Sequence, residues 1–228
     1  MERFSTKFCP KGAGLLIFDL DGTLADTIWG IRDGVNLAMA KYGYPERSYE
    51  EIRLAIGNGA RELIRLSMPT DAAEDAALVD RVYEDYDSFY GETYVNCRFY
   101  EGIRETLSTL RERGYTLAVL SNKQDLYVKT MVSELFEEGL FSHVAGQTSL
   151  PKKPDPTVPL MIAEVLGFAP SETAFIGDSD VDILTGRNAG MVTVGCSWGY
   201  RDRSALVAQG ADVIADSPRE LAELFISA

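Results

Sequence analysis

Two pairs of carboxylates stand out because each lies where a short apolar run of the sequence ends. Asp19 and Asp21 follow the first run, and Asp178 and Asp182 lie just beyond the end of a later one. Charged side chains are rarely fully buried without a partner, so acids at the ends of buried segments call for a cation. Carboxylate oxygens are hard ligands that suit Mg²⁺. The four acids therefore indicate a magnesium site.

Each acidic pair also has a simpler interpretation. A lone Asp-x-Asp pair can be a solvated turn, and Gly22 permits the unusual dihedral angles of a tight turn directly after it. Asp178 and Asp182 can decorate the N-terminus of a helix, whose dipole offsets their repulsion. The complete string Asp-Leu-Asp-Gly-Thr at residues 19–23, directly after an apolar run, favours the functional interpretation over the solvated turn.

Other polar residues could bind phosphate oxygens. Ser121 and Asn122 follow another apolar run, where they could cap the next helix. A hydroxyl beside a helix N-terminus also makes a site for anions, so both interpretations can hold. Lys153 belongs to a Lys-Lys-Pro stretch that could be solvated surface, but Pro154 and Pro156 stiffen its loop. A fixed ammonium there could balance the charge of the carboxylates.

The elements that must position these side chains alternate along the chain. Short apolar runs predict strands, and the amphipathic stretches between them predict helices. The expected strands are residues 14–20, 115–120, 173–177, 191–195 and 212–215, with a short one at 143–146. The expected helices are residues 102–113, 123–136, 156–166 and 180–189. This alternation predicts an α/β fold with a doubly wound parallel sheet, in which ligands bind outside the carboxyl ends of the strands.

One long segment breaks the alternation. Residues 27–95 carry helical signals and no strand-like run. We therefore expect an all-helical module inserted directly after the first strand. Residues 1–26 and 96–228 would form the α/β core. An insert at that position would sit over the edge of the sheet where the acids lie.

Composition narrows the classes of function. The 228 residues include 22 basic and 35 acidic side chains, which gives a formal net charge of −13 at pH 7. Such an acidic surface disfavours nucleic acid and anionic membranes as partners. The only histidine, His143, is interpreted as structural, and a zinc site of several histidines is excluded. Cys9, Cys97 and Cys196 are far apart and the first residues lack an apolar stretch, so a reduced, cytoplasmic setting is expected.

In their order and at these strand ends, the motifs resemble those of the haloacid dehalogenase superfamily. They are the DxDGT string at 19–23, Ser121-Asn122, Lys153-Pro154 and the GDxxxD string at 177–182. The helical insert resembles the C1-type cap of that superfamily. Within it, the sequences at 19–26, 56–59, 121–123 and 195–200 look most like phosphoglycolate phosphatases. The resemblance implies a Rossmann-like core, dependence on Mg²⁺ and hydrolysis of phosphomonoesters.

The resemblance also implies a role for each acid. Asp19 would attack phosphorus and form an aspartyl-phosphate. Asp21 would protonate the leaving oxygen and then activate water, and its presence argues for phosphoryl transfer because dehalogenases proper lack it. Mg²⁺ would be held by Asp19, the backbone carbonyl of Asp21 and Asp178. Asp182 would support the metal or pair with Lys153.

The phosphoryl group would be bound by the remaining motif residues. Ser121, Asn122 and Lys153 would contact its oxygens and neutralise charge as it moves. The backbone amides of Gly22 and Thr23 would add further donors.

Selection of the substrate would come from the cap, which in this superfamily opens and closes over the site. The candidates are Gly57, Asn58, Gly59 and Arg61. Arg61 could bind a substrate carboxylate as a planar fork, or it could be a solvated helix residue. The expected partner is a small phosphorylated metabolite such as 2-phosphoglycolate, with the protein a monomer or homodimer. A pyrophosphatase, a sugar-phosphate phosphatase or mutase, and a non-catalytic binding module remain alternatives.

Overall fold

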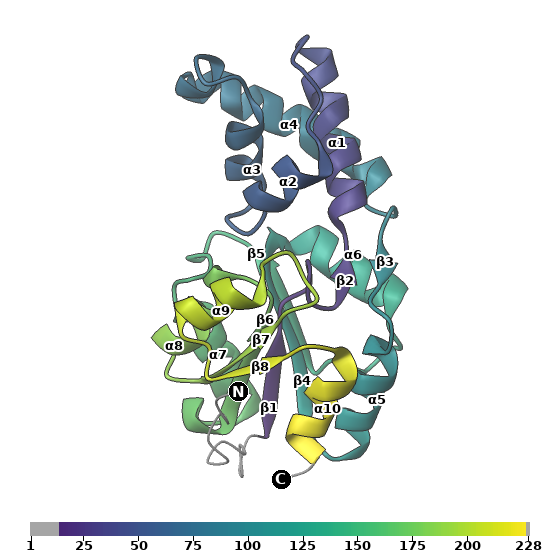
Figure 1. Ribbon diagram of the computed structural model, residues 1–228, viewed down its shortest axis with the longest axis vertical. Helices are drawn as coiled ribbons and strands as arrows, with labels where there is room; N and C mark the ends of the chain where they lie inside the picture. Colours follow the sequence, from purple (N-terminus) through teal and green to yellow (C-terminus); the bar gives the residue numbers. More distant parts are fainter. Residues whose placement is uncertain (1–13, 227–228) are drawn as a thin grey trace.

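A six-stranded sheet forms the centre of the computed structural model, which describes residues 14–226 (Figure 1). Its strand order is β5-β4-β1-β6-β7-β8, and every neighbouring pair is parallel. The strands are β1 (Leu15–Phe18), β4 (Thr116–Gln124), β5 (His143–Gln147), β6 (Thr173–Gly177), β7 (Val192–Cys196) and β8 (Val213–Ala215). All six expected strands are present, so the prediction of a parallel α/β sheet is confirmed.

Helices cover both faces of this sheet. One face packs against α5 (Ile103–Glu112), α6 (Asp125–Leu135) and α10 (Pro218–Ile226), and the other against α7 (Thr157–Leu166) and α8 (Asp180–Asn188). The short helix α9 (Arg203–Gln209) packs against β7 and β8. The sequence patterns predicted four of these helices and missed α9 and α10. Within residues 14–226, no helix combines the length and the apolar character needed to cross a bilayer.

Strand β1 lies in the middle of the sheet, and its four side chains are completely buried. Leu16 and Phe18 point into the apolar cluster on one face, and Leu15 and Ile17 into the cluster on the other. A strand buried on both faces must be apolar throughout, which explains its unbroken run. Because β4 and β6 flank β1, the chain reverses its winding direction at β1, and such a switch point opens a crevice at the carboxyl ends.

A group of helices stands above that crevice (Figure 1). The group consists of α1 (Ile28–Lys41), α2 (Tyr49–Ala55), α3 (Ala60–Ser67), a 3-10 turn (Ala72–Glu74) and α4 (Ala76–Thr93). It is joined to the sheet by the antiparallel pair β2 (Ala25–Asp26) and β3 (Arg98–Phe99). These helices pack around an apolar cluster of their own, to which Tyr200 from the loop after β7 also belongs.

Candidate active site

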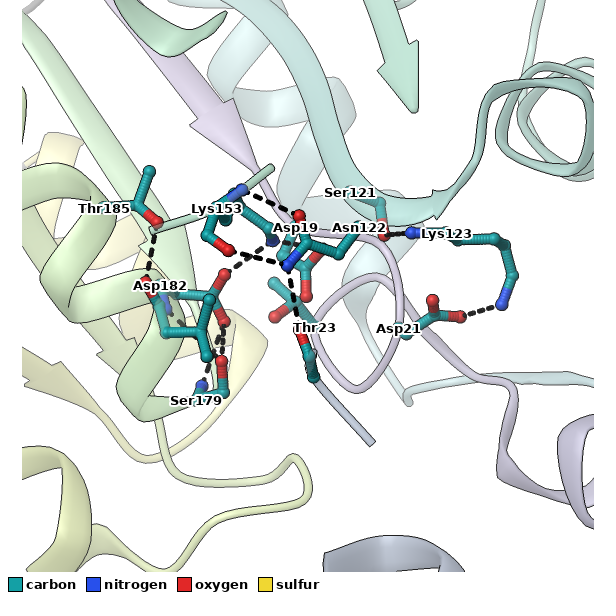
Figure 2. A network of polar contacts seen from close by, with 12 residues as sticks. Asp19, Asp21, Thr23, Ser121, Asn122, Lys123, Lys153, Ser179, Asp182 and Thr185 are labelled. Carbon is teal, nitrogen blue, oxygen red and sulfur yellow. Dashed lines mark hydrogen bonds and ion pairs between the residues drawn. The ribbon is translucent and has the colours of Figure 1, made fainter. Parts of the chain in front are cut away.

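The carboxyl ends of three neighbouring strands bring sequence-distant polar residues to one point (Figure 2). Asp19 follows β1, Ser121 lies near the end of β4, and Asp178 follows β6. All three are buried, with no more than 6% of each residue exposed. They line one cavity of about 60 Å³ together with residues of the helices above the crevice. The placement of these residues at one edge, inferred from the ends of the apolar runs, is what the structure shows.

Three carboxylates crowd together at the centre of this site. Oxygens of Asp19, Asp178 and Asp182 all lie within 4.8 Å of one another, and each residue is buried. The Lys153 ammonium lies 2.8 Å from Asp19 Oδ1 and 2.7 Å from Asp182 Oδ1. The three carboxylates carry more negative charge than the one lysine can balance, and all four side chains are buried. Because the donors are hard oxygens, a divalent cation such as Mg²⁺ fits this set of ligands.

The pKa values of these groups show the same imbalance. Burial raises the pKa of Asp19 to about 7, even though Lys153 acts to lower it and Asp182 adds to the rise. Burial and the neighbouring Asp182 and Asp19 raise the pKa of Asp178 well above its ordinary value. Burial disfavours the charged form of Lys153, but the carboxylates of Asp182 and Asp19 raise its pKa overall. A bound cation would stabilise the ionised acids.

Asp178 is held rigidly by its surroundings. Its Oδ1 accepts a hydrogen bond from Thr23 Oγ1 at 2.9 Å, and its Oδ2 accepts one from the Tyr200 N–H at 2.6 Å. Gly22 has a φ of +88°, and a Cβ there would lie 2.3 Å from Asp178 Oδ2. A Cβ on Gly199 would lie 2.3 Å from Asp178 Cβ. Both glycines are therefore needed for the backbone to pass this close to the acid.

The backbone amide of Gly22, which was expected to bind phosphate, has a different partner in the structure. Its N–H donates to the carbonyl of Ala25 at 2.9 Å and closes the turn after β1. The amide is thus already used within the turn, and the contribution of Gly22 is the space that it leaves for Asp178. Thr23 likewise acts through its hydroxyl on Asp178.

Asp182 uses its two oxygens for different tasks. Oδ2 accepts bonds from the Ser179 N–H at 3.0 Å and from Ser179 Oγ at 2.6 Å, and the Asp182 N–H donates back to Ser179 Oγ. This reciprocal pair is a capping box that begins α8. Oδ1 is left to bind Lys153. Of the two roles considered for Asp182, the structure displays the pairing with Lys153.

Asp21 lies apart from Asp19 and Asp182, beside Lys123 (Figure 2). Its Oδ1 accepts bonds from Lys123 Nζ at 2.6 Å and from the Thr27 hydroxyl. The Lys123 ammonium is also 5.0 Å from the centre of the Tyr90 ring. The sequence placed Lys123 in the string at 121–123 that resembles phosphoglycolate phosphatases, but no role was assigned to it. Asp21 thus lines the same cavity as Asp19 but is held apart from the acidic cluster by its own lysine.

Ser121 and Asn122 do not cap a helix, which corrects one of the two sequence interpretations. Strand β4 continues through Gln124, and α6 begins at Asp125 without a side-chain cap. Asn122 instead fixes the Lys153 loop: its Oδ1 accepts from the Lys153 N–H at 2.9 Å and its Nδ2 donates to the Lys153 carbonyl at 3.0 Å. Nδ2 also donates to the carbonyl of Gly57, 2.9 Å away.

The helices above the crevice supply the other wall of the cavity. Of the candidates from this region, Gly57 and Gly59 line the cavity, whereas Asn58 and Arg61 do not. The Arg61 Nε instead pairs with Asp80 of α4 at 2.6 Å, and both side chains are about half exposed. The Asn58 carbonyl accepts a bond from Lys152 Nζ at 2.5 Å. Arg61 therefore lies away from a ligand in the cavity.

A different arginine joins the two parts of the molecule. Arg201, in the loop after β7, lines the cavity and donates to the carbonyls of Arg53 at 2.7 Å and Ile56 at 2.8 Å, at the C-terminal end of α2. Arg53 in turn donates to the carbonyl of Tyr200. We call these reciprocal bonds between α2 and residues 200–201 the arginine clasp. A guanidinium at a helix C-terminus also interacts favourably with the helix dipole.

We predict that Arg201→Met lowers kcat/KM about tenfold. Removal of the guanidinium deletes hydrogen bonds from a charged donor, each contributing about 1.5–3 kcal/mol, so the end of α2 and the cavity wall at Ile56 and Gly57 are held less firmly. The matched variant is Arg61→Met, which breaks only a half-exposed ion pair that contributes about 0–1 kcal/mol. Steady-state kinetics of both variants would test this. A larger loss in Arg61→Met than in Arg201→Met would show that Arg61 is the residue that acts on the substrate.

Comparison with known proteins agrees with this geometry. A family model described as haloacid dehalogenase-like hydrolase matches residues 16–196. The phosphoglycolate phosphatase of Haemophilus influenzae is 34% identical over 91% of this chain and 96% of its own length. That of Pseudomonas syringae pv. tomato is 30% identical over 97% of this chain and 83% of its own length. A crystal structure from Haemophilus somnus, described as a predicted phosphoglycolate phosphatase, superposes with a TM-score of 0.85 at 30% identity, covering 92% of this chain and 97% of the other.

Proposed function

The chain belongs to the haloacid dehalogenase-like hydrolase family and is a phosphatase, and we propose that its substrate is a small phosphorylated acid, 2-phosphoglycolate first. The observation that carries the proposal is the buried cluster of Asp19, Asp178, Asp182 and Lys153 at the end of β1, with Asp21 held apart from it by Lys123. The names of the relatives support the choice of substrate.

The reaction begins with Asp19. One carboxylate oxygen of Asp19 attacks phosphorus, an O–P bond forms, and the bond from phosphorus to the leaving oxygen breaks. Asp21 gives its proton to the leaving oxygen. Asp21 then takes a proton from water, which attacks phosphorus and frees Asp19. The separate position of Asp21, beside Lys123 and Thr27, supports this division of work between two acids.

The other residues hold charge and orientation. Lys153 contacts Asp19 directly and would neutralise the transferring oxygens, and Ser121 offers a hydroxyl to them. Mg²⁺ would be held by Asp19, Asp178 and the backbone carbonyl of Asp21, where it would offset the negative charge of the cluster. Asn122 keeps the Lys153 loop in position.

We further propose that residues 27–95 are a C1-type cap and that residues 1–26 and 96–228 are the catalytic core. The separate apolar cluster of α1–α4 supports this division. The net charge of −13 supports a small metabolite as partner in place of nucleic acid or an anionic membrane. We place the protein in the cytoplasm as a monomer or homodimer.

A panel of phosphate esters tests the substrate. Phosphate release with Mg²⁺ would be measured for 2-phosphoglycolate, pyrophosphate and hexose phosphates. We expect kcat/KM for 2-phosphoglycolate to exceed that of the other compounds at least about tenfold, because differences in transition-state binding of about 1.4 kcal/mol suffice for this. A preference for pyrophosphate or for a hexose phosphate would overturn the choice of substrate but leave the phosphatase chemistry intact.

A further inference from the structure

The cap wall of the cavity is almost entirely apolar. Its side chains come from α1, α3, α4 and the turn before α3, and they include Ile31, Ile56, Leu63, Tyr86 and Tyr90. The cationic side chains nearby are engaged in other contacts. Two that line the cavity come from the core: Lys123 pairs with Asp21, and Arg201 donates to the carbonyls of Arg53 and Ile56. Arg61 pairs with Asp80, and Lys152 binds the Asn58 carbonyl. Two polar features remain on this wall, and both are donors without an acceptor.

The first feature is the start of α3. Its N-cap residue is Gly59, with φ 87° and ψ 160°, and no side chain caps the helix. The first amide to find an acceptor is that of Leu63, which donates to the Gly59 carbonyl. The amides of Ala60, Arg61 and Glu62 therefore have no acceptor within residues 14–226. Gly59 and Ala60 line the cavity. Unpaired amides at the positive end of a helix dipole favour an anion.

The second feature is the hydroxyl of Tyr86 on α4. The residue is only 3% exposed, and its ring stacks on Tyr90 with centroids 5.4 Å apart. In the described part of the chain, this hydroxyl makes no hydrogen bond. Three neighbouring tyrosines are engaged: Tyr83 accepts from Gln124, Tyr127 donates to the Asp87 carbonyl, and Tyr90 contacts the sulfur of Met131. Burial raises the pKa of Tyr86, so its hydroxyl keeps its proton and can donate.

We propose that the α3 amides and the Tyr86 hydroxyl together bind the carboxylate of the substrate, on the opposite wall from the clustered acids. This inference rests on the proposed function. Backbone amides at a helix N-terminus together with a neutral hydroxyl can hold a carboxylate, which brings a single negative charge to balance where a second phosphate would bring more. An apolar wall without acceptors also offers little to the hydroxyls of a sugar. The cavity of about 60 Å³ is narrow, which favours a small ligand over a large one.

Two substitutions remove one donor each with little change of shape. Tyr86→Phe deletes the hydroxyl. Ala60→Pro deletes the first amide of α3, where proline is compatible with the helix and Gly59 is already extended in ψ. Tyr83→Phe is the matched control, because it deletes a hydroxyl of α4 that does not line the cavity. The two substrates are 2-phosphoglycolate and ethyl phosphate, an ester of similar size that lacks the carboxylate.

We expect Tyr86→Phe and Ala60→Pro each to lower kcat/KM for 2-phosphoglycolate about tenfold and to leave that for ethyl phosphate within twofold of the wild type. In Tyr83→Phe, the ratio of kcat/KM for 2-phosphoglycolate to kcat/KM for ethyl phosphate should equal that of the wild type. Equal losses on both esters would indicate a structural effect and overturn the subsite, and so would unchanged kinetics on both.

The wild type separates this result from the proposed function. If it hydrolyses another phosphorylated acid better than 2-phosphoglycolate, the substrate choice fails and the ratio is taken with that acid. If it hydrolyses ethyl phosphate as well as every phosphorylated acid, both proposals are overturned.

Discussion

Asp19→Asn is expected to reduce phosphate release by a factor on the order of 10⁴ or more, the scale seen when an enzyme loses its nucleophile. An amide oxygen is a poor nucleophile, and Asp19 is the carboxylate nearest to Lys153 that also opens on the cavity. A sensitive assay of released phosphate would measure the residual rate. Asp80→Asn is the matched control, because it removes a half-exposed carboxylate of α4 and should retain full activity.

The loss in Asp19→Asn should occur without unfolding. Burial opposes the charged form of Asp19, so replacing it with a neutral amide of the same shape relieves a cost in the metal-free protein. Lys153 keeps Asp182 as a partner, so no buried charge is left alone. Thermal unfolding in metal-free buffer should show a melting temperature equal to or above that of the wild type. Full activity in a folded Asp19→Asn protein would disprove the mechanism.

Removal of divalent cations should stop turnover, and addition of Mg²⁺ should restore it. The reason is the unbalanced charge of Asp19, Asp178 and Asp182, which are buried beside a single lysine. Phosphate release would be measured in EDTA and again after Mg²⁺ is supplied in excess. Hydrolysis at the full rate in EDTA would remove the metal from the proposal.

Stability gives a second measure of the metal that does not depend on turnover. At a Mg²⁺ concentration of 100 times its dissociation constant, the folded protein should gain about 2.7 kcal/mol. Asp178→Asn removes one carboxylate of the cluster while Asp182 still pairs with Lys153, so its melting temperature should respond little to Mg²⁺. An equal rise of melting temperature in the wild type and in this variant would place the metal elsewhere.

The sheet and its acids were predictable because their signals are local. A strand buried on both faces must be apolar over its whole length, so β1 and β6 could be recognised from a few consecutive residues. The acids that follow β1 and β6 then meet at one edge by the geometry of parallel strands. Helix α10 carries an equally local signal in Leu221, Ala222 and Phe225, which the sequence interpretation overlooked.

The residues that were missed act across long sequence separations. Lys123 was assigned to the start of a helix, but strand β4 continues to Gln124. The Lys123 ammonium donates to Asp21, 102 residues earlier in the chain. Arg201 contacts α2 across more than 140 residues, whereas Arg61 points to Asp80. Nothing in the residues around Arg61 and Arg201 distinguishes them. Their surroundings are decided by packing between distant segments.

The position of Tyr200 limits which segments can be exchanged between this protein and its relatives in a chimaera. Its ring is buried in the apolar cluster of helices α1–α4, its hydroxyl accepts a bond from the Thr27 N–H, and its own N–H donates to Asp178. A chimaera that replaced residues 27–95 alone would therefore place foreign helices against a Tyr200 side chain that packs with the original ones. Helices α1–α4 and the loop at residues 199–201 therefore have to be exchanged together.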